Sequence, residues 1–487
     1  MLMPAKAGSQ PRISAVVRTA VEPMHLAACA IAALVVGATV KPLSETDLFW
    51  HVPLGQQILS QHAVHGAGSG WTIAPGVGGW TSSEWLGEVA LAWTRMHLGW
   101  SGILWLRLLI AAILVFSVLR LALSHSTARV GAVLMAAIGI PLAAGIQERP
   151  QLVSLVLLCP VSVWGWRILT QSHPPRWFVV VPLVFVWAQI HSLWLMAPAI
   201  FILAAVCRAV GEGRSGLVDL RRTVGLSVAL LIAGCITPVG PRALLLPFKL
   251  QSATSRIAEW QPTSPLDTLA LGLMLIVGLM VLAWTRPTAG SRLVPTSELL
   301  YTAAVVGFAM MAYRNVLPAL ILLIPLAGTR LSMTNWGRET QVGQREGRVL
   351  ATACTVTLVA AALIGAARTA TVPTFSPHVP VAIAAKLASD GAEHRILNAY
   401  NASGALVAFG GPGIRLAVDG RADRWGPHYL NDYLDAINMR GDWRGYIAKL
   451  RVTDAVLVHD APIVSELVHD GWTNVMTDGG YTLLRSP

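Results

Sequence analysis

Charged residues are scarce in this sequence. Only 13% of its 487 residues are Asp, Glu, Lys or Arg, whereas 54% are hydrophobic. A soluble protein carries about a quarter charged residues, so the composition excludes a disordered chain and an ordinary soluble enzyme. With a mean hydropathy of +0.59, the chain fits an α-helical multi-pass membrane protein.

Cysteine and acidic residues are also few. All five cysteines lie in or beside apolar runs, at Cys29, Cys159, Cys207, Cys235 and Cys354. None has the spacing of metal ligands, so we expect neither a disulfide nor a zinc site. The 25 acidic residues are outnumbered by 36 Lys and Arg, which leaves a net charge of +11. The positions of the arginines decide whether this excess reflects nucleic-acid binding or membrane topology.

Long apolar runs make up much of the chain. Eleven have roughly the length of a membrane span: 25–40, 103–123, 130–146, 152–169, 177–190, 193–210, 224–236, 269–284, 299–313, 316–326 and 349–366. Polar residues from Gln189 to Ser192 separate the fifth run from the sixth. The stretch 177–210 is therefore either two spans or one broken segment.

Arginine is concentrated in alternate loops. With the N-terminus in the cytoplasm, the cytoplasmic loops hold Arg167, Arg176, Arg208, Arg214, Arg221, Arg222, Arg286, Arg292, Arg330, Arg338, Arg345 and Arg348. The outer loops hold few cations, among them Lys41, Arg149, Arg242, Lys249, Arg256 and Arg314. This asymmetry predicts a plasma-membrane protein with a cytoplasmic N-terminus and an outer C-terminus. It also removes nucleic acid as a partner.

The chain divides into three parts. We expect a cytoplasmic segment at 1–23, a transmembrane domain at 24–367 with a long first outer loop at 43–100, and an extracytoplasmic domain at 368–487. In the last part, strand-length runs at 395–398, 414–418, 455–458 and 481–484 alternate with helical patterns at 381–389, 428–438, 443–450 and 463–470. This alternation predicts a small α/β domain.

The first outer loop opens with the sequence S-E-T-D-L-F-W-H at 44–51. In a helix, Asp47 and His51 share a face, and the apolar residues Leu48, Phe49, Trp50, Val52 and Leu54 rest on lipid headgroups. Asp47 could then act as a general base toward a hydroxyl acceptor, and His51 could orient that carboxylate or contact phosphate. The alternative is that Asp47 caps the helix and His51 is an interfacial polar residue.

The same loop ends in W-T-S-S-E-W-L-G-E at 80–88. Thr81 and Glu84 have the spacing of a capping box, which is the role we favour for Glu84. Glu84 and Glu88 also share a helix face. A carboxylate pair there is able to hold a divalent cation such as Mg²⁺ or Mn²⁺, or to shift the pKa of one member.

Three outer-loop arginines lie in polar clusters at the ends of spans: Arg149, Arg242 and Arg314, the last followed by Asn315. Ionisable groups at the membrane are costly and mark function by default, and arginine suits phosphate binding. The alternative is snorkelling to the interface, which is strongest for Arg242. His191 either faces a cavity or caps a broken helix, and we prefer the cap.

Together these elements resemble the GT-C superfamily of glycosyltransferases that use polyprenyl-phosphate sugars. More closely, the chain is similar to an uncharacterised group of bacterial multi-pass proteins through five stretches: D-L-F-W-H at 47–51, E-W-L-G-E at 84–88, R-P-Q at 149–151, R-N at 314–315 and D-G-R-A-D at 419–423. The last follows an apolar strand, at the end where α/β domains bind ligands. Asp419, Arg421 and Asp423 either bind a sugar or phosphate or form a salt-bridged turn.

The resemblance implies transfer of a hexosyl or pentosyl group from a polyprenyl-phosphate donor to an outer-face glycan, lipid or protein. It makes Asp47 the candidate catalytic carboxylate and Glu84 a second acidic position, with Glu88, the outer arginines, Asn315 and the D-G-R-A-D turn as substrate-binding candidates. The chain departs from the better-known enzymes in lacking an Asp-Asp or Asp-Glu pair near Asp47. A non-catalytic envelope protein whose outer domain binds glycan or a partner, and a transporter, are the alternatives.

Overall fold

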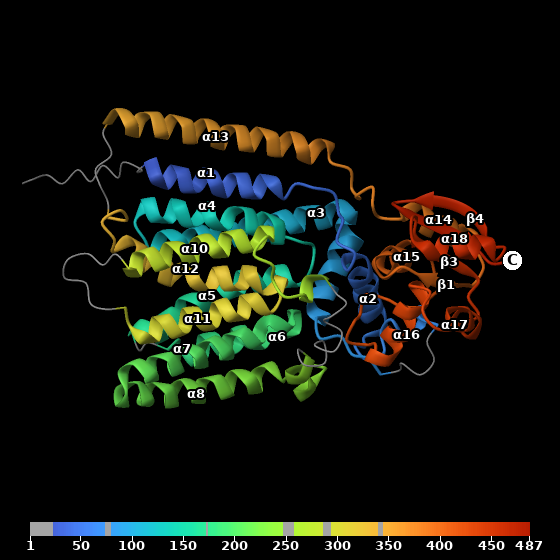
Figure 1. The fold of residues 1–487 in the computed structure, drawn as a ribbon, viewed down its shortest axis with the longest axis horizontal. Coiled ribbons are helices and arrows are strands. Elements are labelled where there is room, and N and C mark those ends of the chain that lie inside the picture. The colour runs from blue at the N-terminus through green and yellow to red at the C-terminus, as the bar shows by residue number, and fades with distance from the viewer. Residues whose placement is uncertain (1–22, 74–78, 172–173, 247–257, 286–293, 339–343) are drawn as a thin grey trace, which may run out of the picture.

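The computed structural model describes residues 23–73, 79–171, 174–246, 258–285, 294–338 and 344–487. Its long helices lie side by side in a bundle, and a sheet domain covers one end of that bundle (Figure 1). The bundle helices are α1 (Pro23–Ala38), α3 (Trp85–Ser124), α4 (Ala128–Gly145), α5 (Gln151–Gln171), α6 (Trp177–Ile190), α7 (Met196–Glu212), α8 (Arg214–Gly234), α10 (Thr268–Thr285), α11 (Thr296–Met311), α12 (Val316–Ser332) and α13 (Gln344–Thr371).

Each of the eleven predicted apolar runs overlaps one of these helices. Among the described residues, six helical stretches are long and apolar enough to cross a membrane: Trp85–Ser124, Ala128–Gly145, Gln151–Gln171, Ser192–Glu212, Thr268–Thr285 and Tyr313–Ser332. Residues 1–22 and four of the loop cations, Lys249, Arg256, Arg286 and Arg292, lie outside the described residues.

The polar interruption at 189–192 separates two helices of the bundle, α6 and α7. His191 ends α6 with an extended backbone (φ −166°, ψ 147°), and a short 3-10 helix, η2 (Ser192–Leu195), leads into α7. The far end of α7, at Gly211, lies against Ser297 at the start of α11. At the other end of these two helices, His191 before α7 and Arg314 after α11 line the same cavity. The stretch Ser192–Glu212 is long and apolar enough to cross a membrane, whereas Trp177–Ile190 is shorter. The choice between two spans and one broken segment therefore stays a prediction.

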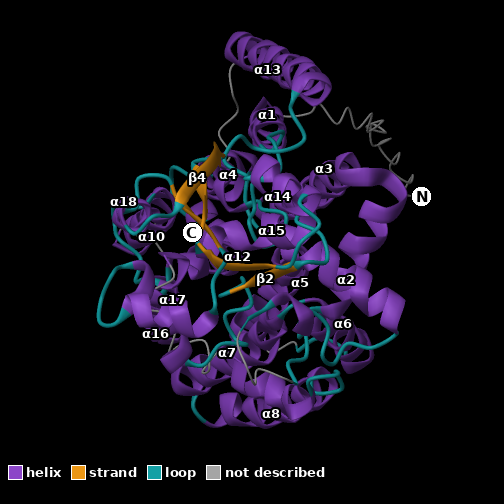
Figure 2. Cartoon of the chain, turned by 90° about the vertical axis from the view of Figure 1, so that its right-hand side faces the viewer, coloured by secondary structure: helices purple, strands orange, loops and turns teal. Residues whose placement is uncertain are grey.

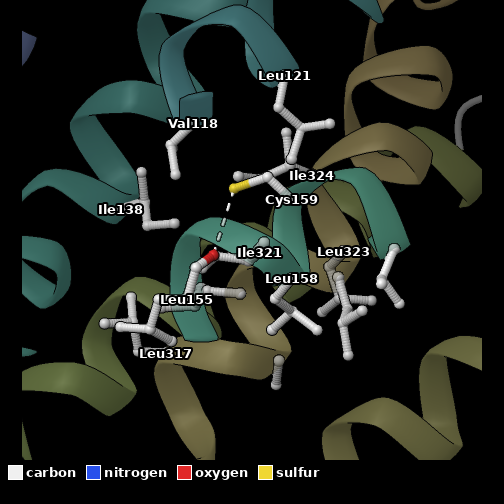
Figure 3. Close-up of a cluster of buried hydrophobic side chains, with 14 of the residues drawn as sticks. Val118, Leu121, Ile138, Leu155, Leu158, Cys159, Leu317, Ile321, Leu323 and Ile324 are labelled. Carbon is white, nitrogen blue, oxygen red and sulfur yellow. Dashed lines mark hydrogen bonds between the residues drawn. The ribbon is translucent and has the colours of Figure 1, made fainter. Parts of the chain in front are cut away.

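Helix α12 is the centre of the bundle. Every residue from Val316 to Gly328 is buried, and the helix packs on α4, α5 and α10. Figure 3 shows Leu317 and Ile321 of α12 beside Leu155 and Cys159 of α5. In contrast, α13 lies at the rim, where it contacts α1 (Figure 2).

The C-terminal domain has the predicted α/β alternation. Its elements are α14 (Val381–Ser389), β1 (His394–Asn398), α15 (Ser403–Phe409), β2 (Ile414–Leu416), α16 (Pro427–Ile437), α17 (Trp443–Leu450), β3 (Asp454–Val458), α18 (Pro462–His469), β4 (Thr473–Asp478) and β5 (Tyr481–Arg485). The sheet order is β2-β1-β3-β5-β4. Strands β2, β1 and β3 are parallel to one another, and β5 runs antiparallel to its two neighbours, β3 and β4. All four predicted strands and four predicted helices are confirmed; β4 and α15 were missed.

The first loop and the C-terminal domain form one unit at the end of the bundle. The backbone N–H of Leu43 donates to the carbonyl of Thr374 (2.9 Å), and that of Ile73 donates to Leu416 (2.9 Å), so the loop extends the edge of the sheet at β2. Helix α2 (Leu48–Gln61) packs between α15 and the first part of α3. Helix α3 bends at Gly99, which has a φ of 69°.

The apolar face of α2 does not rest on lipid headgroups, and that prediction is wrong. Leu48, Phe49 and Leu54 are at most 1% exposed, because they are covered by the C-terminal domain and α3. The ring of Phe49 lies 5.5–5.9 Å from those of Trp100, Phe375 and Phe409. The sequence pattern identified an apolar face correctly, but the partner is protein rather than lipid.

Candidate active site

A cavity of about 720 Å³ lies where the bundle meets the C-terminal domain. Its lining includes eight of the predicted site residues: Asp47, His51, Glu84, Glu88, Arg149, Arg314, Arg421 and Asp423. They come from the first loop, from the ends of bundle helices and from the turn after β2. The fold thus brings together residues that are widely separated in the sequence.

Asp47 is held by hydrogen bonds but remains open to the cavity. It precedes the first residue of α2, yet its side chain makes no capping hydrogen bond, so the capping interpretation is wrong. Its Oδ1 accepts a hydrogen bond from Trp50 Nε1 (3.0 Å), and its Oδ2 lies 3.1 Å from Arg149 Nη2. The side chain is 23% exposed. These contacts orient an accessible carboxylate.

Three carboxylates surround Arg149. Its Nη2 contacts Glu45 Oε1 (2.7 Å) as well as Asp47, and its Nη1 contacts Glu259 Oε2 (2.9 Å). Burial lowers the pKa of Arg149, but the carboxylates outweigh it and leave that pKa raised. Burial also raises the pKa of Glu45, against the opposing effect of Arg149.

Glu45 was not among the predicted site residues, although its carboxylate lies beside that of Asp47 on Arg149. Glu45 and Asp47 share one guanidinium nitrogen of Arg149. The only signal in the sequence was their spacing of two residues, which puts a Glu rather than an Asp beside the candidate base. Glu259 gave no signal, because nothing in a sequence places it opposite the first loop.

His51 pairs with Glu88 rather than with Asp47. Its Nδ1 lies 3.3 Å from Glu88 Oε1, and both side chains are buried. Burial lowers the pKa of His51, but the hydrogen bond with Glu88 and the charges of Glu84 and Asp47 outweigh it, so the pKa is raised. The protonated imidazole is therefore stabilised beside Glu88. The expectation that His51 orients Asp47 is wrong.

Glu84 forms the second Glu–His pair of the cavity. Its Oε1 lies 3.4 Å from His191 Nε2. Glu84 makes no capping hydrogen bond with its side chain and directly precedes α3, so the capping-box prediction is wrong. Burial raises the pKa of Glu84 to about 7. This carboxyl therefore changes its protonation state near neutral pH.

His191 fulfils both roles weighed for it. Its Nδ1 accepts a hydrogen bond from the backbone N–H of Leu193 (3.1 Å), which caps η2. The proton consequently resides on Nε2, which faces Glu84. Burial lowers the pKa of His191 well below its usual range, and the positive charges of Arg314, His51 and Arg149 lower it further. A neutral His191 is able to donate to Glu84.

Arg314 completes the charged wall of the cavity. Its guanidinium lies 4.4 Å above the ring of Trp260, and its Nη1 is 3.4 Å from Glu259 Oε1. Glu259 thus connects Arg314 with Arg149. Despite this density of acids, no group of three or more His, Cys, Asp or Glu among the described residues is arranged to hold a metal ion.

The D-G-R-A-D turn is engaged within the protein. Arg421 has no exposed side-chain surface; its Nε lies 3.1 Å from both carboxylate oxygens of Asp419, and its Nη1 and Nη2 donate to the carbonyls of Ala67 (3.1 Å) and Gly68 (2.9 Å). Trp71 and Trp80 lie on its guanidinium at 5.0 and 4.9 Å. The salt-bridged turn is therefore the correct interpretation for Asp419 and Arg421.

Asp423 accepts a hydrogen bond from Trp80 Nε1 (2.9 Å) and lines the cavity, where burial raises its pKa. Besides Asp419, which pairs with Arg421, two predicted site residues do not line the cavity. Arg242 is exposed in the 3-10 helix η3 (Gly240–Leu245). Asn315 donates to the carbonyl of Phe308 (3.0 Å) at the start of α12, which is a structural role.

No family model matches the sequence, and no curated protein is similar to it. Among solved structures, the oligosaccharyltransferase of Archaeoglobus fulgidus is similar in its apo form, with a TM-score of 0.53 and 10% identity over 89% of this chain and 69% of that one. The form tethered with an acceptor peptide has a TM-score of 0.52, 10% identity, and coverage of 89% and 68%.

ArnT from Cupriavidus metallidurans, bound to undecaprenyl phosphate, aligns with a TM-score of 0.49 and 12% identity over 94% of this chain and 97% of that one. The agreement with the oligosaccharyltransferase extends over the bundle and the C-terminal domain. It confirms an α-helical multi-pass membrane protein with a small C-terminal sheet domain. The chain therefore shares the fold of the Archaeoglobus fulgidus oligosaccharyltransferase.

Proposed function

We propose that the protein is a GT-C-type glycosyltransferase of the plasma membrane. It takes a hexosyl or pentosyl group from a polyprenyl-phosphate donor and transfers it at the outer face to a hydroxyl of a glycan, lipid or protein. The observation that supports this best is the placement of Asp47: an oriented and accessible carboxylate faces a cavity of about 720 Å³ at the end of an apolar helix bundle.

Asp47 is the general base in this proposal. As the acceptor oxygen forms its bond to the anomeric carbon, Asp47 takes the hydroxyl proton. The bond between that carbon and the phosphate oxygen breaks, and its electron pair leaves with the polyprenyl phosphate. The hydrogen bond from Trp50 and the contact with Arg149 fix the orientation of the carboxylate.

The two arginines have different roles. Three carboxylates already surround Arg149 and outnumber its single positive charge, so it serves to hold Asp47 rather than to neutralise a phosphate. Arg314 faces one carboxylate at 3.4 Å and the ring of Trp260. Arg314 is therefore the better group to neutralise the leaving phosphate. A divalent cation such as Mg²⁺ or Mn²⁺ stays a prediction, and none of these steps depends on it.

Sugar transfer in proteoliposomes tests the proposal. Wild-type protein, Asp47→Asn and Arg314→Gln are compared with a panel of hexosyl and pentosyl polyprenyl phosphates, with polyprenyl phosphate release as the readout. General-base catalysis contributes roughly 10²–10⁴-fold, so Asp47→Asn lowers kcat by at least about 100-fold. Arg314→Gln raises KM for the donor in addition to lowering kcat.

Asp460→Asn is the matched control, because Asp460 is exposed and outside the cavity lining. It retains wild-type turnover. Wild-type-like turnover by Asp47→Asn removes Asp47 from the mechanism. A wild-type protein that binds glycan but releases no phosphate from any donor overturns the enzyme proposal and favours the non-catalytic envelope protein.

A further inference from the structure

We infer that Gly420, in the turn after β2, is a positioning residue that fixes the Asp47 carboxylate through Trp50. Its effect on sugar transfer rests on the proposed function, whereas its contact with Asp47 does not. The turn was considered above as a ligand-binding element and as a salt-bridged turn. The geometry of Gly420 gives the turn a third role. Because Gly420 has no side chain, the C-terminal domain can pack against the two atoms that form the hydrogen bond between Trp50 and Asp47.

The contact at Gly420 leaves no space for a side chain. A Cβ atom at this position would overlap Trp50 Nε1 and would lie 2.8 Å from Trp50 Cδ1 and 2.9 Å from Asp47 Oδ1. The atoms Nε1 and Oδ1 are the donor and acceptor of the hydrogen bond that orients Asp47. The φ of Gly420 lies outside the left-handed region, so the need for glycine comes from this contact and not from backbone conformation.

Neither side of the contact is free to withdraw. The carbonyl of Gly420 accepts hydrogen bonds from Tyr400 Oη and from the backbone N–H of Ala422, both at 3.0 Å. Trp425 Nε1 holds the preceding carbonyl at Asp419 (3.1 Å). On the other side Trp50 is buried, and its ring lies on His51 with centroids 3.7 Å apart. A methyl group at position 420 therefore finds no space on either side, and the displacement it causes includes the Trp50 and Asp47 side chains that it would contact.

The C-terminal domain contacts the same segment at a second glycine. A Cβ atom at Gly404, in α15, would overlap the carbonyl of Thr46, the residue before Asp47. The backbone of Leu43 forms hydrogen bonds with Thr374 and Ser376, on either side of Phe375. The C-terminal domain thus contacts the first loop before, at and after Thr46. These contacts make the domain a structural part of the site that Asp47 occupies.

The first experiment compares Gly420→Ala with Gly426→Ala in full-length protein. Gly426 lies in the same loop but has open space around its Cβ position, so it is the matched control. Misplacement of a reacting group by about 1 Å costs up to ~100-fold in rate. We expect Gly420→Ala to lower kcat by at least about tenfold on that basis, with little change in KM for the donor, and Gly426→Ala to match wild type.

Positioning is separated from simple destabilisation by a double substitution. Trp50→Phe removes the indole donor to Asp47. If Gly420 acts through that hydrogen bond, Gly420→Ala costs much less in the Trp50→Phe background than in wild type. A merely structural effect gives the same fold-loss in both backgrounds. Equal kcat for Gly420→Ala and Gly426→Ala, or an undiminished loss in the Trp50→Phe background, overturns the positioning role.

Hydrogen–deuterium exchange gives a readout that does not depend on activity. We expect the backbone amides of residues 47–54 to exchange faster in Gly420→Ala than in wild type, because a Cβ atom at position 420 disturbs the Trp50–Asp47 pair. Gly426→Ala exchanges at the wild-type rate. Faster exchange in Gly420→Ala together with a wild-type protein inert toward every donor overturns the proposed function but not the contact. Exchange at the wild-type rate in Gly420→Ala overturns the contact itself.

Discussion

The cavity has two walls of different chemistry. The bundle wall carries ionisable side chains, namely Asp47, His51, Glu84, Glu88, Arg149, Glu259 and Arg314. The wall from the C-terminal domain is largely aliphatic and aromatic, with Tyr400, Leu430, Tyr433, Leu434, Ile437 and Ala461. Reactive groups therefore belong mainly to the bundle and its first loop. The C-terminal domain shapes the cavity and holds the loop in place.

Arg149 and Arg421 show this difference on a small scale. Arg149 is 18% exposed in the cavity and contacts three carboxylates from two separate loops. Arg421 is sealed between Trp71 and Trp80, with one carboxylate and two backbone carbonyls as partners. The surroundings of Arg149 leave an excess of negative charge, while those of Arg421 are balanced. We therefore assign Arg149 to the site and Arg421 to the architecture.

The largest effect is expected for Arg149→Met. The substitution leaves Glu45, Asp47 and Glu259 without their shared cation, and removal of one partner from a partly buried charge cluster is strongly unfavourable. Asp47 also loses one of its two orienting contacts. We expect sugar transfer to fall by at least about 100-fold, as measured by initial rates in proteoliposomes.

Two comparison variants sharpen this result. Arg149→Lys keeps the charge but not the forked geometry, so its activity lies between those of wild type and Arg149→Met. Arg242→Met removes an exposed outer-loop arginine and leaves transfer unchanged. If Arg149→Met transfers sugar at a rate similar to Arg242→Met, the division between a reactive bundle wall and a supporting domain wall is wrong.

Arg421→Met is expected to act on stability. It leaves Asp419 as an unpaired buried carboxylate and frees the carbonyls of Ala67 and Gly68. Breaking a buried pair costs about 3–5 kcal/mol. Thermal unfolding in detergent measures the loss, and limited proteolysis shows whether the first loop detaches from the domain.

The matched control for this prediction is Arg444→Met. Arg444 also contacts two acids, Glu466 and Asp470, but on an exposed surface. Exposed ion pairs contribute little, so the unfolding midpoint stays at the wild-type value. Combining Asp419→Asn with Arg421→Met recovers part of the lost stability, because the unpaired charge is gone. Equal midpoints for Arg421→Met and Arg444→Met would contradict the architectural role.

The sequence predicted the parts of the molecule better than their contacts. Apolar runs and strand–helix alternation are local patterns, so the eleven bundle helices and most of the C-terminal elements could be predicted. Arg149 and Arg314 were recognised because charges beside apolar runs are costly, and Asp47 because it follows the first apolar run and shares a helix face with His51. Arg242 had the same local pattern but is exposed, since a local pattern does not say which span ends meet.

Apart from the missed β4 and α15, these errors concern tertiary partners. The apolar face of α2 was assigned to lipid because the sequence does not show that the C-terminal domain covers it. Glu84 was assigned to a cap because its partner, His191, is more than a hundred residues away. Gly420 looked like an ordinary turn residue, and only its approach to Trp50 and Asp47 reveals its role.

Glu84→Gln gives the smallest effect and tests whether the bundle wall keeps an ionisable group at a cost in stability. The folded pKa of about 7 lies above the unfolded value near 4.3. Between these values the folded protein binds more protons, so stability falls as pH rises from about 4.3 to 7, and the full cost is present above 7. Gln does not ionise. Its advantage in unfolding midpoint over wild type therefore grows from pH 5 to pH 8 and reaches a few degrees.

The measurement is a series of thermal unfolding curves at pH 5, 6, 7 and 8, with Glu393→Gln as the control because Glu393 is exposed on the C-terminal domain. The Glu393→Gln midpoint follows that of wild type at every pH. A difference in unfolding midpoint that stays constant from pH 5 to pH 8 would contradict a Glu84 whose pKa is raised to about 7. If the midpoint difference grows with pH and Glu84→Gln also transfers sugar more slowly than wild type at pH 8, Glu84 lowers stability but supports activity. The aliphatic and aromatic residues of the domain wall carry no such cost in stability.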